Sequence, residues 1–94
     1  MDTNDKIIIT VSGADKVGIV AKVATLLADC KVNIEDIKQT LMQGHFVMFM
    51  LCSIAASNKS LKELQSVLKE ECNKMNMEVW VQRKEIFDNM HTVE

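Results

Sequence analysis

The sequence lacks several features that would point to particular functions. Its 94 residues contain no proline, three glycines and a single arginine. Without proline or a low-complexity tract there is no sign of a linker, so we expect one domain with one two-layer core. No apolar run reaches transmembrane length, and the acidic first residues, Met1-Asp2-Thr3-Asn4-Asp5, do not resemble the basic start of a signal peptide. A cytoplasmic location with no membrane contact is the prediction.

An excess of basic residues is also missing. The 11 Lys and Arg residues are scattered among 13 Asp and Glu residues, for a net charge of -2. Proteins that bind the phosphate backbone need clustered positive charge. We therefore expect no direct binding to nucleic acid.

The three cysteines are odd in number and widely spaced. Cys30, Cys52 and Cys72 each lie within an apolar pattern. This usage is typical of reduced thiols in the core of a cytosolic protein.

The first part of the chain predicts a strand followed by a helix. Residues 6–12 (KIIITVS) are rich in β-branched side chains, with Ile7, Ile9 and Val11 on one face. From Gly18 the apolar residues recur at spacings of three and four, which predicts an amphipathic helix, and Asp15 is its expected N-cap. The apolar stripe consists of Ile19, Val20, Val23, Leu26, Leu27 and Cys30.

Two further strands are predicted to form a hairpin. Residues 32–43 read as a strand, but Ile34 and Ile37 break strict alternation and predict a bulge near Glu35-Asp36. Gln43-Gly44 is a hairpin turn. Residues 45–54 (HFVMFMLCSI) are apolar on both faces, which is typical of a strand in the middle of a sheet.

The last part of the chain predicts a second helix and a fourth strand. Ser60 and Glu63 form a capping box before the helix, whose apolar stripe is Leu61, Leu64, Val67, Leu68, Cys72 and Met75. The strand places Met77, Val79 and Val81 on one face and Trp80 on the other. In residues 85–92, Ile86, Phe87 and Met90 share a helical face.

This order predicts an α+β fold of the ferredoxin-like βαββαβ type, a two-layer sandwich with a four-stranded antiparallel sheet and both helices on one face. The domain covers residues 1–84, and residues 85–94 form a short tail, predicted to be helical. The other face of the sheet exposes Ile8, Trp80 and alternate residues of 46–54, so it needs a cover. The tail, a second subunit or both can supply it, and we expect a homodimer.

The stretch from Gly13 to Gly18 (GADKVG) allows two interpretations. The first N–H groups of a helix lack internal partners and attract an anion, and Gly18 would let a ligand approach closely. Alternatively, Gly13 only reverses the chain, Asp15 only caps the helix and Gly18 is small to fit against the sheet. The stretch is not a nucleotide-binding loop of the Walker type, because no Lys-Ser/Thr pair follows it.

In this element order, Asp15-Lys16-Val17-Gly18-Ile19-Val20 at the first turn and Asn33-Ile34 at the start of the second strand resemble the ACT domain, the amino-acid-sensing module of many metabolic enzymes. The resemblance covers roughly residues 5–84. It is strongest to small stand-alone bacterial and archaeal ACT proteins that resemble the first half of the glycine-cleavage transcriptional repressor. The stretches that carry it are VSGADKVGIVAKV, NIEDI leading into Gln39-Thr40, and IFDNMH.

The resemblance implies a ligand, typically an amino acid, between the first turn of one subunit and the start of the second strand of a neighbour. The corresponding ligand-binding positions are Asp15, Gly18, Ile19, Asn33 and Ile34. Many ACT domains have proline where this chain has Val17, so the turn here is less rigid. No cofactor is implied.

We expect no catalytic or metal site. Ser12 has no histidine or acid near it in the sequence, and Glu35 and Asp36 would share a proton only if the bulge turned both to one face. His45 and His91 lack the spacing of a metal site. Copper-carrying domains of this fold need Cys-x-x-Cys in the first turn and acylphosphatases need an arginine there, but the only arginine is Arg83.

The sequence thus predicts a regulatory module, not an enzyme, that binds an amino acid or related small anion at a subunit interface and passes its occupancy to a partner. The alternative is a ligand-free structural dimer that recruits a protein partner through its sheet face.

Overall fold

The computed structural model describes residues 5–14 and 17–90, without the side chains of Met42 and Met90. The elements follow in the order β1 (Lys6–Ala14), α1 (Ile19–Asp29), β2 (Asn33–Met42), β3 (His45–Ser53), α2 (Leu61–Asn73), β4 (Glu78–Arg83) and α3 (Lys84–Met90). The predicted βαββαβ order is confirmed, and a short helix follows it.

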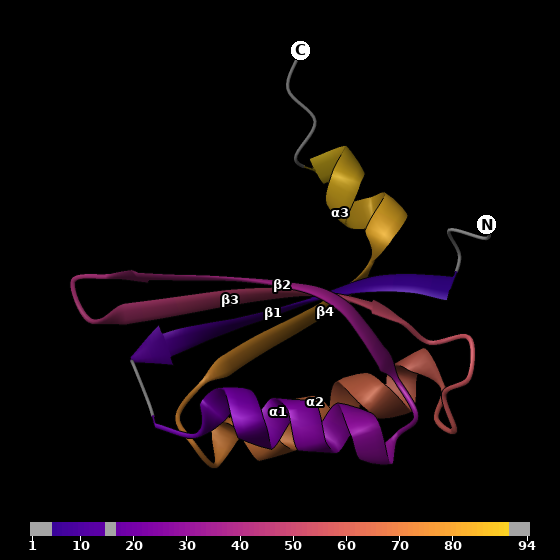
Figure 1. Cartoon of the computed structure of the whole chain (residues 1–94), viewed down its shortest axis with the longest axis horizontal. Helices are drawn as coiled ribbons and strands as arrows, with labels where there is room; N and C mark the ends of the chain where they lie inside the picture. Colours follow the sequence, from indigo (N-terminus) through magenta and orange to yellow (C-terminus); the bar gives the residue numbers. More distant parts are fainter. Residues whose placement is uncertain (1–4, 15–16, 91–94) are drawn as a thin grey trace.

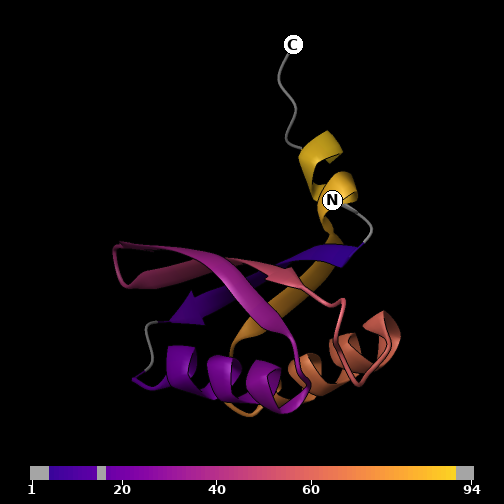
Figure 2. The ribbon, with the colours of Figure 1, turned by 45° about the vertical axis from the view of Figure 1, so that its right-hand side comes forward.

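The strands form one antiparallel sheet in the order β2-β3-β1-β4. Helices α1 and α2 lie side by side beneath one face of this sheet, and α3 rises from the opposite face (Figures 1 and 2). We call that opposite side the open face. The predicted two-layer ferredoxin-like fold is therefore confirmed.

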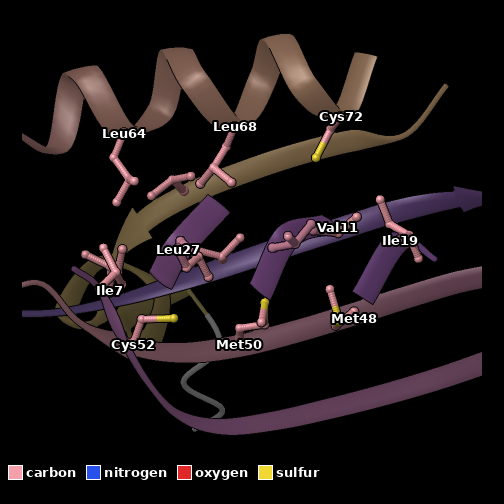
Figure 3. Close-up of a cluster of buried hydrophobic side chains, with 14 of the residues drawn as sticks. Ile7, Val11, Ile19, Leu27, Met48, Met50, Cys52, Leu64, Leu68 and Cys72 are labelled. Atoms are coloured by element: carbon pink, nitrogen blue, oxygen red, sulfur yellow. The ribbon is translucent and has the colours of Figure 1, made fainter. Parts of the chain in front are cut away.

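The core lies between the sheet and the pair α1 and α2, where side chains from both layers meet (Figure 3). Ile7, Ile9 and Val11 on the helix side of β1 are fully buried, as predicted. The three cysteines are free thiols buried in the same core. Burial raises the pKa of Cys52 to about 12, with Glu35 adding to the effect, so this thiol stays protonated and unreactive at neutral pH.

The bulge predicted in β2 is present. Ile34 pairs with Cys52 and Asp36 with the next residue of β3, Leu51, so Glu35 is the extra residue. Because one residue is inserted, Ile34 and Ile37 both face the helices although they are three positions apart. Asp36 and, two residues on, Lys38 consequently lie on the open face.

The hairpin between β2 and β3 turns at Gln43-Gly44, as predicted. Gln43 has φ 52° and Gly44 has φ 81°. Two successive left-handed residues match the right-handed twist of the flanking strands.

The predicted cap of α1 is wrong. The N-cap is Gly18, with φ 89°, and it forms no side-chain cap hydrogen bond. Asp15 lies outside the described residues. A left-handed N-cap suits glycine because it has no Cβ to clash with the backbone.

Gly13, near the end of β1, and Gly18, before α1, have different roles. A Cβ on Gly13 would lie 2.6 Å from Met77 Sδ and 3.2 Å from the backbone oxygen of Asn76, so a larger residue there would have to displace the side chain of Met77. A Cβ on Gly18 would meet nothing within 4 Å. The interpretation that Gly18 is small to fit against the sheet is therefore wrong, and its backbone conformation explains it instead.

The capping box of α2 is confirmed. Glu63 N donates to Ser60 Oγ at 3.2 Å, and Ser60 N donates to Glu63 Oε1 at 2.8 Å. The hydrogen bond from the Ser60 backbone, followed by that from its side chain, lowers the pKa of Glu63.

We expect Ser60→Ala to lower the free energy of unfolding by about 1 kcal/mol, because it leaves an N–H of the first turn without its acceptor. Glu63→Ala should also destabilise the protein, but in a pH-dependent way. A carboxylate whose folded pKa is depressed stabilises the fold above its unfolded pKa and loses that effect as the pH falls through the folded pKa. Urea unfolding at neutral and at acidic pH tests this. Glu70→Ala on the same helix is the control, and an equal pH dependence there would contradict the assignment to the capping box.

Candidate functional site

Gly18, the residue before α1, presents backbone to solvent. Gly18 supplies no side-chain acceptor to the first N–H groups of α1, and the first turn of the helix contains no acidic residue. The space around Gly18 is open. The partial positive charge of the helix N-terminus is therefore not offset by an acidic side chain within that turn.

The predicted ligand residues differ in what they offer. Ile19 is 2% exposed, and its side chain points into the core (Figure 3), so it offers only backbone. Ile34 is partly buried and packs against the same core. Asn33 is exposed at the start of β2. Of the predicted residues that the structure describes, the accessible groups are thus the backbone at Gly18 and the side chain of Asn33.

These two groups lie at opposite ends of one subunit. At one end of the sheet Ala14 pairs with His45, and the turn to α1 follows. At the other end Asn33 pairs with Ser53, which also pairs with Lys6. The 11 residues of α1 separate the ends by about 16 Å at 1.5 Å per residue. One subunit therefore does not bring the two halves of the predicted site together.

Apolar surface surrounds the end of the sheet where the turn lies. Val17 is fully exposed and Leu41 is 58% exposed. Leu41 pairs with Phe46, directly beside the pairing of Phe46 with Gly13. A shallow hollow of about 240 Å³ is lined by Gln39, Thr40, Leu41 and Phe46. This end of the molecule thus offers a helix N-terminus and apolar contacts together.

The open face is only partly covered by α3. The ring of Phe87 packs edge-on against Phe49, with the ring centroids 6.1 Å apart and the planes at 61°. Ile86 remains 48% exposed and Trp80 50% exposed. Phe87 of the tail thus covers part of the open face, as expected, whereas the side chain of Met90 lies outside the described part of the structure.

The structure brings together one pair that was not predicted from the sequence. Ser12 Oγ lies 2.9 Å from His45 Nε2, 33 positions apart in the chain. The register of β1 and β3, in which Ala14 pairs with His45, brings Ser12 and His45 together. No hydrogen bond from His45 to a carboxylate is seen among the described residues, so the orienting third group of a nucleophilic triad is not seen there.

The two neighbouring acids in β2 have different partners. Glu35 forms an ion pair with Lys6, while Asp36 Oδ1 accepts from the backbone N–H of Ile37 at 2.9 Å. Within residues 5–14 and 17–90, no group of three metal-ligating side chains is assembled. His91 lies outside these ranges.

No helix in the described part of the chain is long and apolar enough to span a bilayer. The cytoplasmic location stays a prediction.

Residues 5–82 match the sequence model of the ACT domain family. A UPF0237 protein of Methanosarcina acetivorans is 43% identical over 91 residues, which cover 97% of this chain and 99% of that protein. A UPF0237 protein of Listeria innocua is 40% identical over 84 residues, which cover 89% of this chain and 94% of that protein.

Solved structures agree with this relationship. An ACT domain protein from Streptococcus pneumoniae superimposes with a TM-score of 0.77 at 31% identity, covering 95% of this chain and 97% of that one. A putative glycine cleavage system transcriptional repressor gives a TM-score of 0.73 at 24% identity, covering 83% of this chain and 44% of that one, and shares the fold. On its sequence match, its relatives and its architecture, this chain belongs to the ACT domain family.

Proposed function

We propose that the protein is a regulatory module that binds an amino acid, or a related small anion, between the β1–α1 turn of one subunit and the start of β2 of a second copy. The observation that carries this proposal is the N-terminus of α1, where Gly18 is left-handed, supplies no side-chain cap and, among the described residues, has open space around its Cα. The N–H groups there suit a carboxylate. The side-chain carbonyl of Asn33 from the second copy suits an ammonium group.

The position of β2 supports a site shared by two subunits. β2 is an edge strand of the sheet, and an unpaired edge is a template for pairing with another chain. If two copies pair antiparallel through β2 about a two-fold axis, the start of each β2 lies beside the end of the other. That arrangement moves the second copy's Asn33 to the end of the sheet where Gly18 lies.

A ligand that touches two subunits regulates by favouring the paired state. It shifts the equilibrium only by its difference in affinity between the paired and separate subunits. An amino acid bound in this way would stabilise the homodimer. A partner protein that binds the dimer and the monomer with different affinities would then respond to the concentration of the amino acid.

The exposed Trp80 supports the second function considered for this chain. A half-exposed tryptophan on a sheet face is a typical anchor for a protein partner. In that case the protein would recruit its partner without any small molecule, and no amino acid would stabilise it.

We expect Gly18→Asn to abolish the rise in melting temperature that an amino acid with a small or polar side chain produces in a thermal-shift screen of the proteinogenic amino acids. Asparagine tolerates the left-handed conformation, so the fold is kept, while its side chain occupies the space over the first N–H groups of α1. Gly44→Asn is the matched control, because Gly44 also has a positive φ and open space around it. A stabilisation by a small or polar amino acid that survives Gly18→Asn, or is lost equally in Gly44→Asn, would contradict the site.

Proline substitutions in β2 test the proposed pairing. Successive N–H groups of a strand point to opposite sides, so of Gln39 and Thr40 one donates toward β3 and the other toward the outer edge. We expect one of Gln39→Pro and Thr40→Pro to retain the folded monomer and lose the dimer, as measured by sedimentation velocity and circular dichroism. A wild-type protein that sediments as a monomer with its stabilising amino acid present would refute pairing through β2.

A further inference from the structure

We propose that the open face carries a second small-molecule site, a cavity beneath α3 that binds a zwitterion with an aromatic or large aliphatic body. This site lies on the opposite side of the sheet from α1 and does not involve Gly18 or Asn33. It is complete within one subunit.

The cavity has the size and lining of a ligand pocket. Its volume is about 310 Å³, which is at the lower end of the range for small-molecule pockets, about 300–1,000 Å³. Apolar side chains form its walls and two charged side chains complete it. The lining residues are Ile8, Asp36, Lys38, Phe49, Leu51 and Phe87.

Strand register places the five lining residues other than Phe87 in two adjacent rows across the sheet. Asp36 pairs with Leu51, and Leu51 with Ile8. In the next row on the same face Lys38 pairs with Phe49. The bulge at Glu35 creates this arrangement, because it turns Asp36 and Lys38 to the open face.

Phe87 of α3 forms one wall of the cavity. The ring of Phe87 leans over the sheet onto Phe49, and α3 stands on the open face (Figures 1 and 2). Ile8 is only 8% exposed although it lies on that face. Phe87 lies beyond residue 82, where the match to the ACT domain ends, so the cover is built outside the matched domain.

The two charges determine the class of ligand. Asp36 and Lys38 stand two residues apart on one strand, about 7 Å along its axis, and both are exposed. Neither takes part in an ion pair seen among the described residues. A carboxylate and an ammonium group beside an apolar wall suit a ligand with the opposite pair of charges on a hydrophobic body, such as phenylalanine.

Titration with L-phenylalanine tests the proposal directly. Trp80, the only tryptophan, lies on the row of Phe49, because both pair with Thr10, so its fluorescence reports on the open face, with calorimetry as a second readout. We expect saturable binding, and binding of phenethylamine and of 3-phenylpropionate weaker by about fivefold each, because each lacks one charge. No saturable binding of phenylalanine in the millimolar range would overturn the proposal, and so would equal binding of all three ligands.

Charge variants assign each end of the ligand. Asp36→Asn should weaken the binding of phenylalanine and phenethylamine but leave the binding of 3-phenylpropionate unchanged. Lys38→Gln should weaken the binding of phenylalanine and 3-phenylpropionate but leave the binding of phenethylamine unchanged. Glu70→Gln and Lys62→Gln on exposed positions of α2 are the matched controls and should bind all three ligands as the wild type does. Equal losses in the controls would refute specific contacts.

Two more variants distinguish binding in the cavity from binding at the turn and from dimerisation through the open face. Phe87→Ala should weaken the binding of phenylalanine by about tenfold, because an apolar contact is lost. Ile86→Ala changes the adjacent residue of α3, which does not line the cavity, and should leave this binding unchanged. Gly18→Asn should leave this binding intact. If Gly18→Asn abolishes it, the ligand occupies the turn and the cavity proposal is wrong. If Phe87→Ala changes only the sedimenting mass, a second copy covers the face instead, and the proposal is also wrong.

Discussion

A single inserted residue in β2 determines which side chains each face of the sheet presents. Without the bulge at Glu35, strict alternation would place Ile34 and Asp36 on the same face. A charged group would then enter the core, or an isoleucine would face solvent. With the bulge, Ile34 and Ile37 both face the helices and Asp36 and Lys38 both reach the open face. The strand thus serves the core and the surface at once, and Glu35 itself is held by Lys6.

A second constraint is that α1 and α2 both lie on the same face of the sheet (Figure 1). A chain of 94 residues has enough length for one helical layer, and the seven residues of α3 extend over only part of the other face. Apolar side chains on the open face of the sheet therefore remain partly exposed. The cavity beneath Phe87 follows from this incomplete cover.

Local patterns in the sequence are sufficient to predict most of the fold. The alternation in β1, the helical stripes, the capping box at Ser60 and the break in alternation at Ile34 and Ile37 all report nearby backbone geometry, and each is confirmed. The predicted cap of α1 is wrong because side-chain chemistry favours Asp15, whereas the helix begins at a left-handed glycine. Propensity rules for N-cap residues consider side-chain hydrogen bonds and do not take into account a backbone conformation that only glycine adopts easily.

The surface features depend on contacts between distant segments, and local patterns do not predict these. Ser12 meets His45 only through the register of β1 and β3. The cavity needs that register, the bulge and the placement of α3. The apolar residues of the strands show that the open face needs a cover, but not where the cover leaves a gap.

The two proposed sites differ in what their occupancy can communicate. A ligand at the turn contacts two subunits, so its affinity differs between paired and separate chains and it shifts assembly. A ligand in the cavity contacts one subunit, so by itself it has no reason to bind one state more tightly. The two sites share β2, however, because Asn33 and Asp36 lie on either side of the same bulge. If pairing through the edge of β2 alters that bulge, the cavity changes with it, and the linkage must then be reciprocal. On these two proposals, the rigidity of the bulge at Glu35 decides whether a ligand at one site changes the affinity of the other site for its ligand.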